Sequence, residues 1–295
     1  TSVTMSLIYE VMLKLILIFF LISDFFLQSE SYTTLSHSVR LFYISYRRRF
    51  NGSLPNRMTV VLGMHRSGTS ALTGLLGNLG VSGPTDALGA TENNLLGYWE
   101  SKSLVTSSDK FLSDQNSHWS ELYTWPSGWW KSKDAVEWID SFWNDLQNVY
   151  SIDSHFVLKD PRLCILFEGM IPCIDRSLMQ LDFLLILRPP VESVISLCKA
   201  EQISSRQALH LWIGSVLRSE YLSRHYSRMV FTYQQLLESP DSILDSCGLL
   251  WGKSFTEMIS LEAKSFLRPS LYRTKSSSVR DLFLEENPDL ANLLS

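Results

Sequence analysis

A length of 295 residues suffices for one α/β domain of ordinary size, and a composition that is 45% apolar and 19% charged excludes a disordered chain. The net charge of −4 argues against a general nucleic-acid-binding protein, so any anion site must be local. The four cysteines are scattered in apolar stretches without a CxxC pair, which indicates reduced core residues and not a disulfide framework or a metal site.

Residues 1–57 differ in character from the rest of the chain. The segment 11–27 is almost wholly apolar and has about the minimum length of a membrane-spanning helix. Between residues 31 and 57 there are five arginines and no acidic residue, which would place the body of the chain on the cytoplasmic side of a membrane. Two interpretations stay open: a membrane anchor, or a leader that is not native protein, since Met58 directly precedes the first predicted strand. We therefore expect an N-terminal extension, 1–57, and one domain, 58–295.

The most strongly patterned stretch is 59–80. Its first four residues predict a short buried strand, and leucines at helical spacing from Leu72 onward predict a helix. A strand, a Gly-containing turn and a helix present free backbone N–H groups and the positive end of the helix dipole to an anion. The turn also supplies one positive charge and three hydroxyl groups, from Arg66, Ser67, Thr69 and Ser70.

This turn differs from an ordinary ATP-binding loop. Gly63 and Gly68 have the spacing of a Walker loop, but Thr69 stands where that loop has its lysine, and the positive charge comes earlier, at Arg66. The turn therefore suits a nucleotide with one phosphate at its 5′ end better than a triphosphate. The alternative is a strand-turn-helix unit whose glycines serve the turn only.

Residues 80–100 predict a loop that ends in the sequence Gly97-Tyr-Trp-Glu100. A loop that follows an anion-binding turn is well placed to line the site of a second substrate. Glu100 has two interpretations, a general base or a carboxylate that the dipole of the next helix favours. Residues 101–150 predict helices interrupted by the aromatic stretch 119–130, which could cover a sugar or lipid acceptor. The apolar stripe at 135–146, which includes Trp138, Phe142 and Trp143, is expected in the core.

Three further strands are predicted at 155–158, 181–187 and 229–232, with helices at 163–178 and 204–221. The first of these strands ends in Lys159-Asp-Pro-Arg162, and open α/β sheets bind ligands at such strand ends. We expect Lys159 to face a ligand there, whereas Asp160 and Arg162 are expected to pair with each other or cap the next helix. The second strand is apolar enough for a central parallel strand buried on both faces.

Arg188 directly follows the strand 181–187, and Ser196 comes eight positions later, about two turns into the next helix. Both side chains can therefore approach one volume, where an arginine offers paired N–H groups that fit a phosphate. The alternative is that Arg188 forms a salt bridge at the strand end. Near the C-terminus, Arg268 and Arg273 lie in a basic, hydroxyl-rich segment that is either a late phosphate-binding loop or a solvated tail.

These residues resemble the sulfotransferases that use 3′-phosphoadenosine 5′-phosphosulfate (PAPS) as donor, in particular the bacterial branch of that family. The strings GMHRSGTSALTGLL, GYWE and KDPR and the Arg–Ser spacing carry the resemblance, which covers roughly residues 58–275. It implies an α/β, P-loop-like three-layer fold with a mostly parallel central sheet flanked by helices. The predicted alternation of strands and helices agrees with such a fold.

The resemblance also implies roles for single residues. The implied contacts to the 5′-phosphosulfate are Arg66, Ser67, Gly68, Thr69 and Ser70, and those to the 3′-phosphate are Arg188, Ser196 and Arg273. Lys159 would contact the transferring sulfuryl group, and Arg66 would help it to stabilise charge. Cytosolic members of the family use a histidine two positions after this lysine as base, but Pro161 stands there, so we assign the base to Glu100.

The expected function is therefore transfer of a sulfuryl group from PAPS to a hydroxyl or amine of an acceptor, without a metal. The acceptor can be a small molecule, a glycan or a lipid. Two alternatives stay open: a P-loop nucleotide phosphotransferase and a non-catalytic nucleotide-binding module. We expect a cytoplasmic catalytic domain without a nucleic-acid partner, with any membrane association through 11–27; the sequence does not indicate an oligomeric state.

Overall fold

A computed structural model divides the chain into two compact units, Thr1–Leu54 and Pro55–Ser295. It describes residues 56–91, 97–121, 125–150, 155–177 and 179–267, all of which belong to the second unit. The predicted apolar segment 11–27 and the C-terminal arginines Arg268 and Arg273 lie outside the described residues. Among the residues that are described, no helix combines the length and the apolar character needed to cross a membrane.

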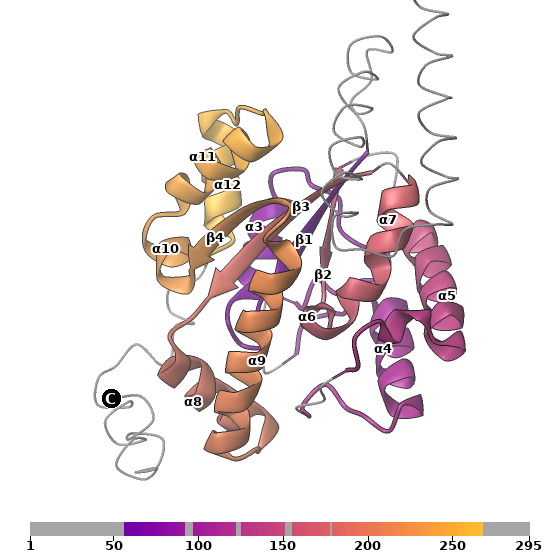
Figure 1. Ribbon diagram of the computed structural model, residues 1–295. Helices are drawn as coiled ribbons and strands as arrows, with labels where there is room; N and C mark the ends of the chain where they lie inside the picture. The colour runs from indigo at the N-terminus through magenta and orange to yellow at the C-terminus, as the bar shows by residue number, and fades with distance from the viewer. Residues whose placement is uncertain (1–55, 92–96, 122–124, 151–154, 178, 268–295) are drawn as a thin grey trace, which may run out of the picture. The chain divides into compact units, whose positions relative to one another are not determined.

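In the described part of the chain, four parallel strands form one sheet in the order β2-β1-β3-β4 (Figure 1). The strands are β1 (Arg57–Leu62), β2 (His155–Lys159), β3 (Gln180–Leu187) and β4 (Ser227–Thr232). Each predicted strand is present, and β1 and β4 begin two residues earlier than predicted. Val61 pairs with both Lys159 and Leu184, so the carboxyl ends of the three neighbouring strands reach the same edge of the sheet.

Helices cover both faces of this sheet (Figure 1). On one face lie α3 (Thr69–Gly77), α10 (Tyr233–Glu238), α11 (Pro240–Trp251) and α12 (Glu257–Ser265). On the other lie α4 (Lys102–Asp114), α5 (Lys133–Val149), α6 (Leu163–Leu166) and α7 (Ile171–Ser177), with 3₁₀ turns at Trp129–Lys131 and Phe167–Met170. The predicted three-layer α/β fold with a parallel sheet flanked by helices is confirmed.

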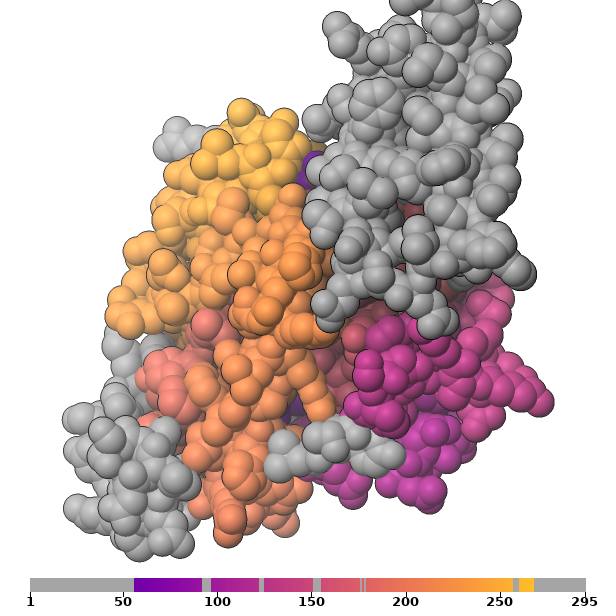
Figure 2. Space-filling view, viewed as in Figure 1, coloured from indigo at the N-terminus to yellow at the C-terminus, as the bar shows by residue number. Residues whose placement is uncertain are grey.

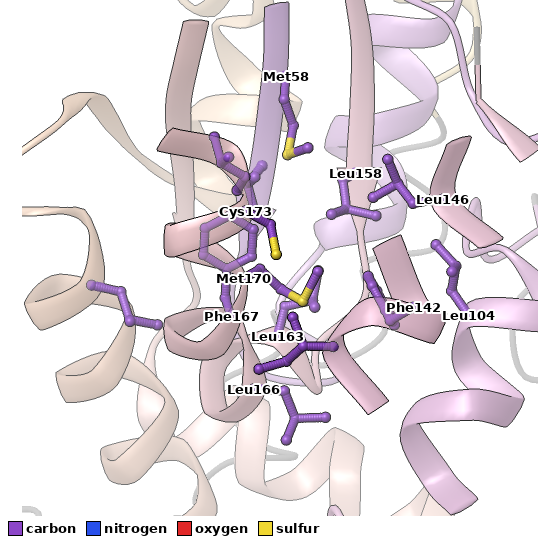
Figure 3. Close-up of a cluster of buried hydrophobic side chains, with 14 of the residues drawn as sticks. Met58, Leu104, Phe142, Leu146, Leu158, Leu163, Leu166, Phe167, Met170 and Cys173 are labelled. Carbon is purple, nitrogen blue, oxygen red and sulfur yellow. The ribbon is translucent and has the colours of Figure 1, made fainter. Parts of the chain in front are cut away.

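The core alternates between the two faces along each central strand, as the two-residue period of a strand requires. In β1, Val60 and Leu62 belong to the cluster packed against α4 and α5, whereas Val61 belongs to the cluster packed against α3 and α11. Figure 3 shows part of the first cluster, in which Met58 and Leu158 of neighbouring strands face side chains from the helices. Burial on both faces explains why these strands read as continuous apolar runs.

The remaining helices, α8 (Pro190–Glu201) and α9 (Ser205–Ser223), follow β3. α9 packs against α8, α6 and β3 and runs along the face of the molecule seen in Figure 2. The prediction of one helix at 163–178 is wrong, because α6, a 3₁₀ turn and α7 occupy it. Gly169 lies in that turn close to α5, where a Cβ atom would approach Ile139 Cδ1 to 3.0 Å, and Pro172 suits the first turn of α7.

Candidate active site

The residues that the sequence singles out come from three neighbouring strand ends. The turn 63–68 follows β1, Lys159 is the last residue of β2, and Arg188 follows β3. Because these parallel strands end at one edge of the sheet, the turn, the ammonium and the guanidinium can share one site.

The turn after β1 has a backbone conformation that restricts its sequence. Arg66 and Gly68 both have positive φ angles, 67° and 98°, and the Ser67 N–H donates to the Met64 carbonyl at 3.1 Å. A Cβ atom on residue 68 would lie 2.3 Å from the ring of Tyr233, so glycine is required there. Helix α3 begins directly afterwards, and the N–H groups of its first turn favour an anion at this end.

The three hydroxyl groups of this region do not have equal access to a ligand. Ser67 and Thr69 are buried, whereas Ser70 is half-buried. The Ser70 hydroxyl donates to the Tyr98 carbonyl at 3.3 Å and accepts from Lys159 Nζ at 3.2 Å. Ser70 is therefore the hydroxyl that links the anion-binding turn to the neighbouring strand end and to the loop before α4.

Arg66 connects the turn to the end of β3 and to α8. Arg188 Nη1 donates to the Arg66 carbonyl at 2.9 Å, and Arg66 Nε donates to Ser196 Oγ at 3.3 Å. The Arg188 guanidinium also lies over the ring of Tyr233, 4.7 Å from its centroid. The structure thus brings Arg66, Arg188 and Ser196 together on the side of the turn.

Sequence analysis missed the carboxylate that accompanies Arg188. Arg188 Nε donates to Glu192 Oε2 at 3.2 Å, and the two residues are only 7% and 5% exposed. The salt bridge that was the alternative interpretation of Arg188 is therefore present, and its four-residue spacing was visible in the sequence. A phosphate that binds Arg188 has to compete with Glu192 for its charge.

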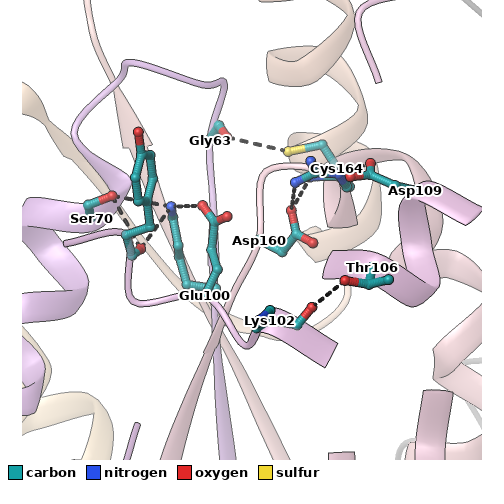
Figure 4. Close-up of polar contacts among 11 residues, drawn as sticks. Gly63, Ser70, Glu100, Lys102, Thr106, Asp109, Asp160 and Cys164 are labelled. Atoms are coloured by element: carbon teal, nitrogen blue, oxygen red, sulfur yellow. Dashed lines mark hydrogen bonds and ion pairs between the residues drawn. The ribbon is translucent and has the colours of Figure 1, made fainter. Parts of the chain in front are cut away.

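Lys159 and Glu100 form the most buried ion pair at this edge (Figure 4), among the residues described. Lys159 is 2% exposed and Glu100 5%, and the ammonium donates to the carboxylate, to Ser70 Oγ and, at 3.2 Å, to the Tyr98 carbonyl. Burial raises the pKa of Glu100 above its ordinary value, while the charge of Lys159 opposes the rise. One cation thus contacts both the anion-binding turn and a carboxylate with a raised pKa.

The backbone before α4 explains how Glu100 reaches Lys159. Gly97 and Trp99 have positive φ angles, 82° and 61°, and the Leu88 N–H donates to the Glu100 carbonyl at 2.7 Å. The N-cap of α4 is Ser101, whose hydroxyl accepts from the Leu104 N–H. Glu100 lies one residue before the cap, and its carboxylate is directed to Lys159.

Asp160 and Arg162 pair with each other, as the sequence indicates. The Asp160 carboxylate accepts from the backbone N–H of Arg162 at 2.9 Å and from Arg162 Nη1 at 3.1 Å. Asp109 of α4 accepts from Arg162 Nη2 at 2.9 Å and completes the compensation of the guanidinium (Figure 4). Two carboxylates thus hold Arg162, which fixes the segment after β2 against α4.

His65 is a second residue that sequence analysis missed, although it lies inside the anion-binding turn. Its half-buried ring packs on Trp119 with centroids 4.2 Å apart, and its Nε2 atom is buried without a hydrogen-bond partner among the described residues. Burial lowers the pKa of His65 well below its ordinary value, and the charges of Arg162, Lys159 and Arg66 lower it further. The imidazole is therefore neutral near pH 7.

The predicted contact Arg273 lies outside the described residues. Within the described ranges, no three side chains of His, Cys, Asp or Glu come together as a metal site would require.

No family model matches the sequence, and no curated protein matches it. Among solved structures, the chain is similar to the sulfotransferase domain of the Synechococcus PCC 7002 olefin synthase, with 16% identity, 75% of this chain and 84% of that chain covered, and a TM-score of 0.44. It is also similar to sulfotransferase STF9 from Mycobacterium avium, with 14% identity, 85% and 81% covered, and a TM-score of 0.42. A sulfotransferase from Alicyclobacillus acidocaldarius is similar with 15% identity, 77% of this chain and 99% of that chain covered, and a TM-score of 0.39. At these values, any functional conclusion depends on the residues of the chain itself.

Proposed function

We propose that the chain is a sulfotransferase that moves a sulfuryl group from PAPS to a hydroxyl or amine of an acceptor. The observation that carries this proposal is the position of Lys159, whose ammonium contacts both Ser70 of the anion-binding turn and Glu100. A seat for the donor's anionic end and a group able to take a proton therefore lie around one buried cation. Group transfer between two bound substrates needs such an arrangement.

The proposed reaction assigns a role to each part of the site. The acceptor oxygen or nitrogen bonds to sulfur while the bond from sulfur to the bridging oxygen of the donor breaks, which yields a sulfated product and adenosine 3′,5′-bisphosphate. Glu100 takes the proton that the acceptor loses. Lys159 and Arg66 stabilise the negative charge that develops on the oxygens around sulfur.

The same assignment separates the two ends of the donor. The turn residues Ser67 to Ser70 and the N-terminal end of α3 hold the 5′-phosphosulfate, where Thr69 replaces the lysine that an ATP-binding loop would have. Arg188 and Ser196 hold the 3′-phosphate, and Arg273 stays a predicted contact. The contacts of Arg66 with both residues support this pairing of sites.

The donor site is tested by ligand-induced thermal stabilisation. We expect adenosine 3′,5′-bisphosphate to raise the melting temperature more than ATP or GTP does, because it fits both proposed phosphate sites. A ligand at one hundred times its Kd adds about 2.7 kcal/mol to the free energy of unfolding. Arg188→Ala should lose most of this shift, measured against its own ligand-free melting temperature, because the variant lacks the proposed 3′-phosphate contact.

Arg224→Ala is the matched control for Arg188→Ala. Like Arg188, Arg224 pairs with a glutamate four positions away, Glu220, and lies over a tyrosine ring, that of Tyr221. It lies at the C-terminal end of α9 and is not a predicted ligand. It should keep the full shift. Stabilisation by ATP alone would contradict the proposed function, and an equal shift in Arg188→Ala would remove Arg188 from the site.

The role of Glu100 is tested by its amide variant. We expect Glu100→Gln to lower the rate of sulfuryl transfer by about 10²–10⁴-fold, the range typical of general base catalysis. In the unchanged protein the rate should fall with decreasing pH already above the ordinary pKa of a glutamate, because only the deprotonated carboxylate accepts the proton and burial raises its pKa. Glu168→Gln, which also replaces a carboxylate whose pKa burial raises, should keep both rate and pH profile. An unchanged rate in Glu100→Gln would refute the assignment.

A further inference from the structure

A cavity opens beside Glu100 of the Lys159–Glu100 pair. It has a volume of about 390 Å³, within the range of small-molecule sites. Its lining joins polar residues, His65, Glu100 and Arg162, to the aromatic and aliphatic side chains of Tyr98, Trp119 and Val105. Glu100 is therefore shared by the proposed catalytic machinery and by this cavity, which makes the cavity the place from which an acceptor can reach the proposed base.

The charges in the wall of the cavity are largely compensated from behind. Glu100 is paired with Lys159, and Arg162 is held by Asp109 and Asp160. A further carboxylate in the lining, Glu201, is exposed. An anionic ligand would find the cationic groups already engaged and carboxylates nearby, so the lining favours an uncharged molecule.

His65 supplies a polar atom that the wall itself does not satisfy. Its ring is packed on Trp119, which restricts its rotation, and Nε2 is buried without a hydrogen-bond partner among the described residues. A buried nitrogen without a partner costs free energy that a bound hydroxyl group can recover. Burial lowers the pKa of His65 and keeps its ring neutral. The charges of Lys159 at the end of β2, of Arg162 just after it and of His118 next to Trp119 act in the same direction.

We propose that this cavity is the acceptor site and that it takes an uncharged ring compound with at least two hydroxyl groups. One hydroxyl meets Glu100 and is sulfated, while His65 Nε2 hydrogen-bonds the other and thereby selects the acceptor. This inference rests on the proposed function, because only the transfer reaction gives Glu100 its part. Aromatic diols and sugar rings share the required chemistry, and the aromatic side chains of Trp119 and Tyr98 in the lining suit both.

The test compares acceptors that differ in the second hydroxyl. We would measure sulfation of phenol, of the three benzenediols, which vary the hydroxyl spacing, and of methyl α-glucoside, with PAPS as donor. At least one diol, or the glucoside, should exceed phenol about fivefold or more in kcat/KM. His65→Leu should reduce the ratio of kcat/KM for that acceptor to kcat/KM for phenol to about one, whereas His65→Gln, which retains a polar nitrogen, should restore part of the preference.

His155→Gln is the matched control, because His155 is another histidine with a lowered pKa but lies at the opposite end of β2. It should keep the preference. Long-range ¹H–¹⁵N spectra of the imidazoles give a readout without turnover: the His65 signal, identified by its loss in His65→Gln, should shift when the preferred acceptor is added to the complex with adenosine 3′,5′-bisphosphate.

The outcomes separate this inference from the proposed function. Failure of adenosine 3′,5′-bisphosphate to stabilise the protein would refute the proposed function, while a shift of the His65 signal on addition of a diol would still support the cavity as a diol site. If the bisphosphate binds but phenol is sulfated as well as every diol and the glucoside, or the His65 signal stays unchanged with all of them, the inference is overturned and the proposed function stands.

Discussion

His155 is the first residue of β2 and lies edge-on against Trp251, with ring centroids 4.5 Å apart. It shares a hydrogen bond of 2.8 Å with Thr59 Oγ1 across the β1–β2 pair. Burial lowers the pKa of His155 from 6.5 to about 3, and the charges of Lys253 and Arg57 act in the same direction. The folded protein therefore keeps this ring neutral at pH values where the unfolded chain is protonated.

This difference predicts an acid-sensitive stability. Below pH 6.5, the pKa of this histidine in the unfolded chain, the unfolded chain binds a proton that the folded protein does not bind. The free energy of unfolding should therefore fall as the pH decreases from 6.5 toward 3. The slope contributed by one such group is on the order of 1 kcal/mol per pH unit. In urea unfolding, His155→Gln should reduce the dependence of the free energy of unfolding on pH between about pH 7 and 5. The part of this dependence that comes from His65, whose pKa is also lowered, should remain. The same slope with and without His155 would show that the histidine does not titrate in this way.

Single residues of the site were predictable where their chemistry is local. The turn residues Arg66 and Ser70 follow from a strand-turn-helix pattern and their own functional groups. The partner of Lys159 could not be predicted in this way, because Glu100 lies 59 positions away and reaches the ammonium through the positive φ of Trp99. Glu192 was within four positions of Arg188 and could have been found by its spacing alone.

At the scale of elements, the turn and α3 depend on the close packing of Tyr233. This residue follows β4 directly, begins α10 and places its ring against Gly68, while the same ring lies under the Arg188 guanidinium. The shape of the proposed donor site is therefore fixed by a strand end that contributes no predicted ligand.

We expect Gly68→Ala to destabilise the protein by about 1–3 kcal/mol, since the new Cβ would meet the Tyr233 ring at 2.3 Å and the φ angle of 98° disfavours a side chain. The displaced ring should also weaken binding of adenosine 3′,5′-bisphosphate. Gly83→Ala is the control, because its Cβ would lie 3.7 Å from Trp99, an ordinary contact. Chemical unfolding and calorimetric titration of both variants provide the measurement, and equal stability of the two would contradict this account.

The strands were predictable to within two residues because both of their faces are buried, which leaves a continuous apolar run in the sequence. The single predicted helix at 163–178 failed for the opposite reason. Its apolar spacing suits a helix, but the break depends on the contact between Gly169 and α5, which is brought in from residues far earlier in the chain. Periodicity records which side chains are buried and not which neighbour they meet.

At the scale of the whole described unit, a buried ion pair ties the sheet together. Arg57 at the start of β1 pairs with Asp182 of β3, which is 0% exposed, and Arg57 Nη1 also donates to the Leu250 carbonyl of α11 at 3.3 Å. Two strands and a helix of one outer layer therefore meet at this guanidinium, at the end of the sheet opposite the candidate site.

Asp182→Asn should destabilise the protein by about 3–5 kcal/mol, because it leaves the guanidinium of Arg57 buried without its counter-ion. The double variant Arg57→Met, Asp182→Leu should recover most of this loss, since burying two apolar groups carries no desolvation cost for charge. Urea unfolding of both proteins measures the difference. A double variant no more stable than Asp182→Asn would mean that the pair contributes by its shape and not by its charge.

The ammonium of Lys159, at the end of β2, contacts both the Glu100 carboxylate and Ser70 of the anion-binding turn, so an anion bound in that turn would also affect the carboxylate. The ion pair with Lys159 restrains the proton affinity of the Glu100 carboxylate. If the proposed donor binds at this turn, its negative charge draws on the same ammonium, and the proton affinity of the carboxylate rises. The proposed function then predicts that the carboxylate takes the proton of the acceptor only once the donor is in place, whichever substrate binds first.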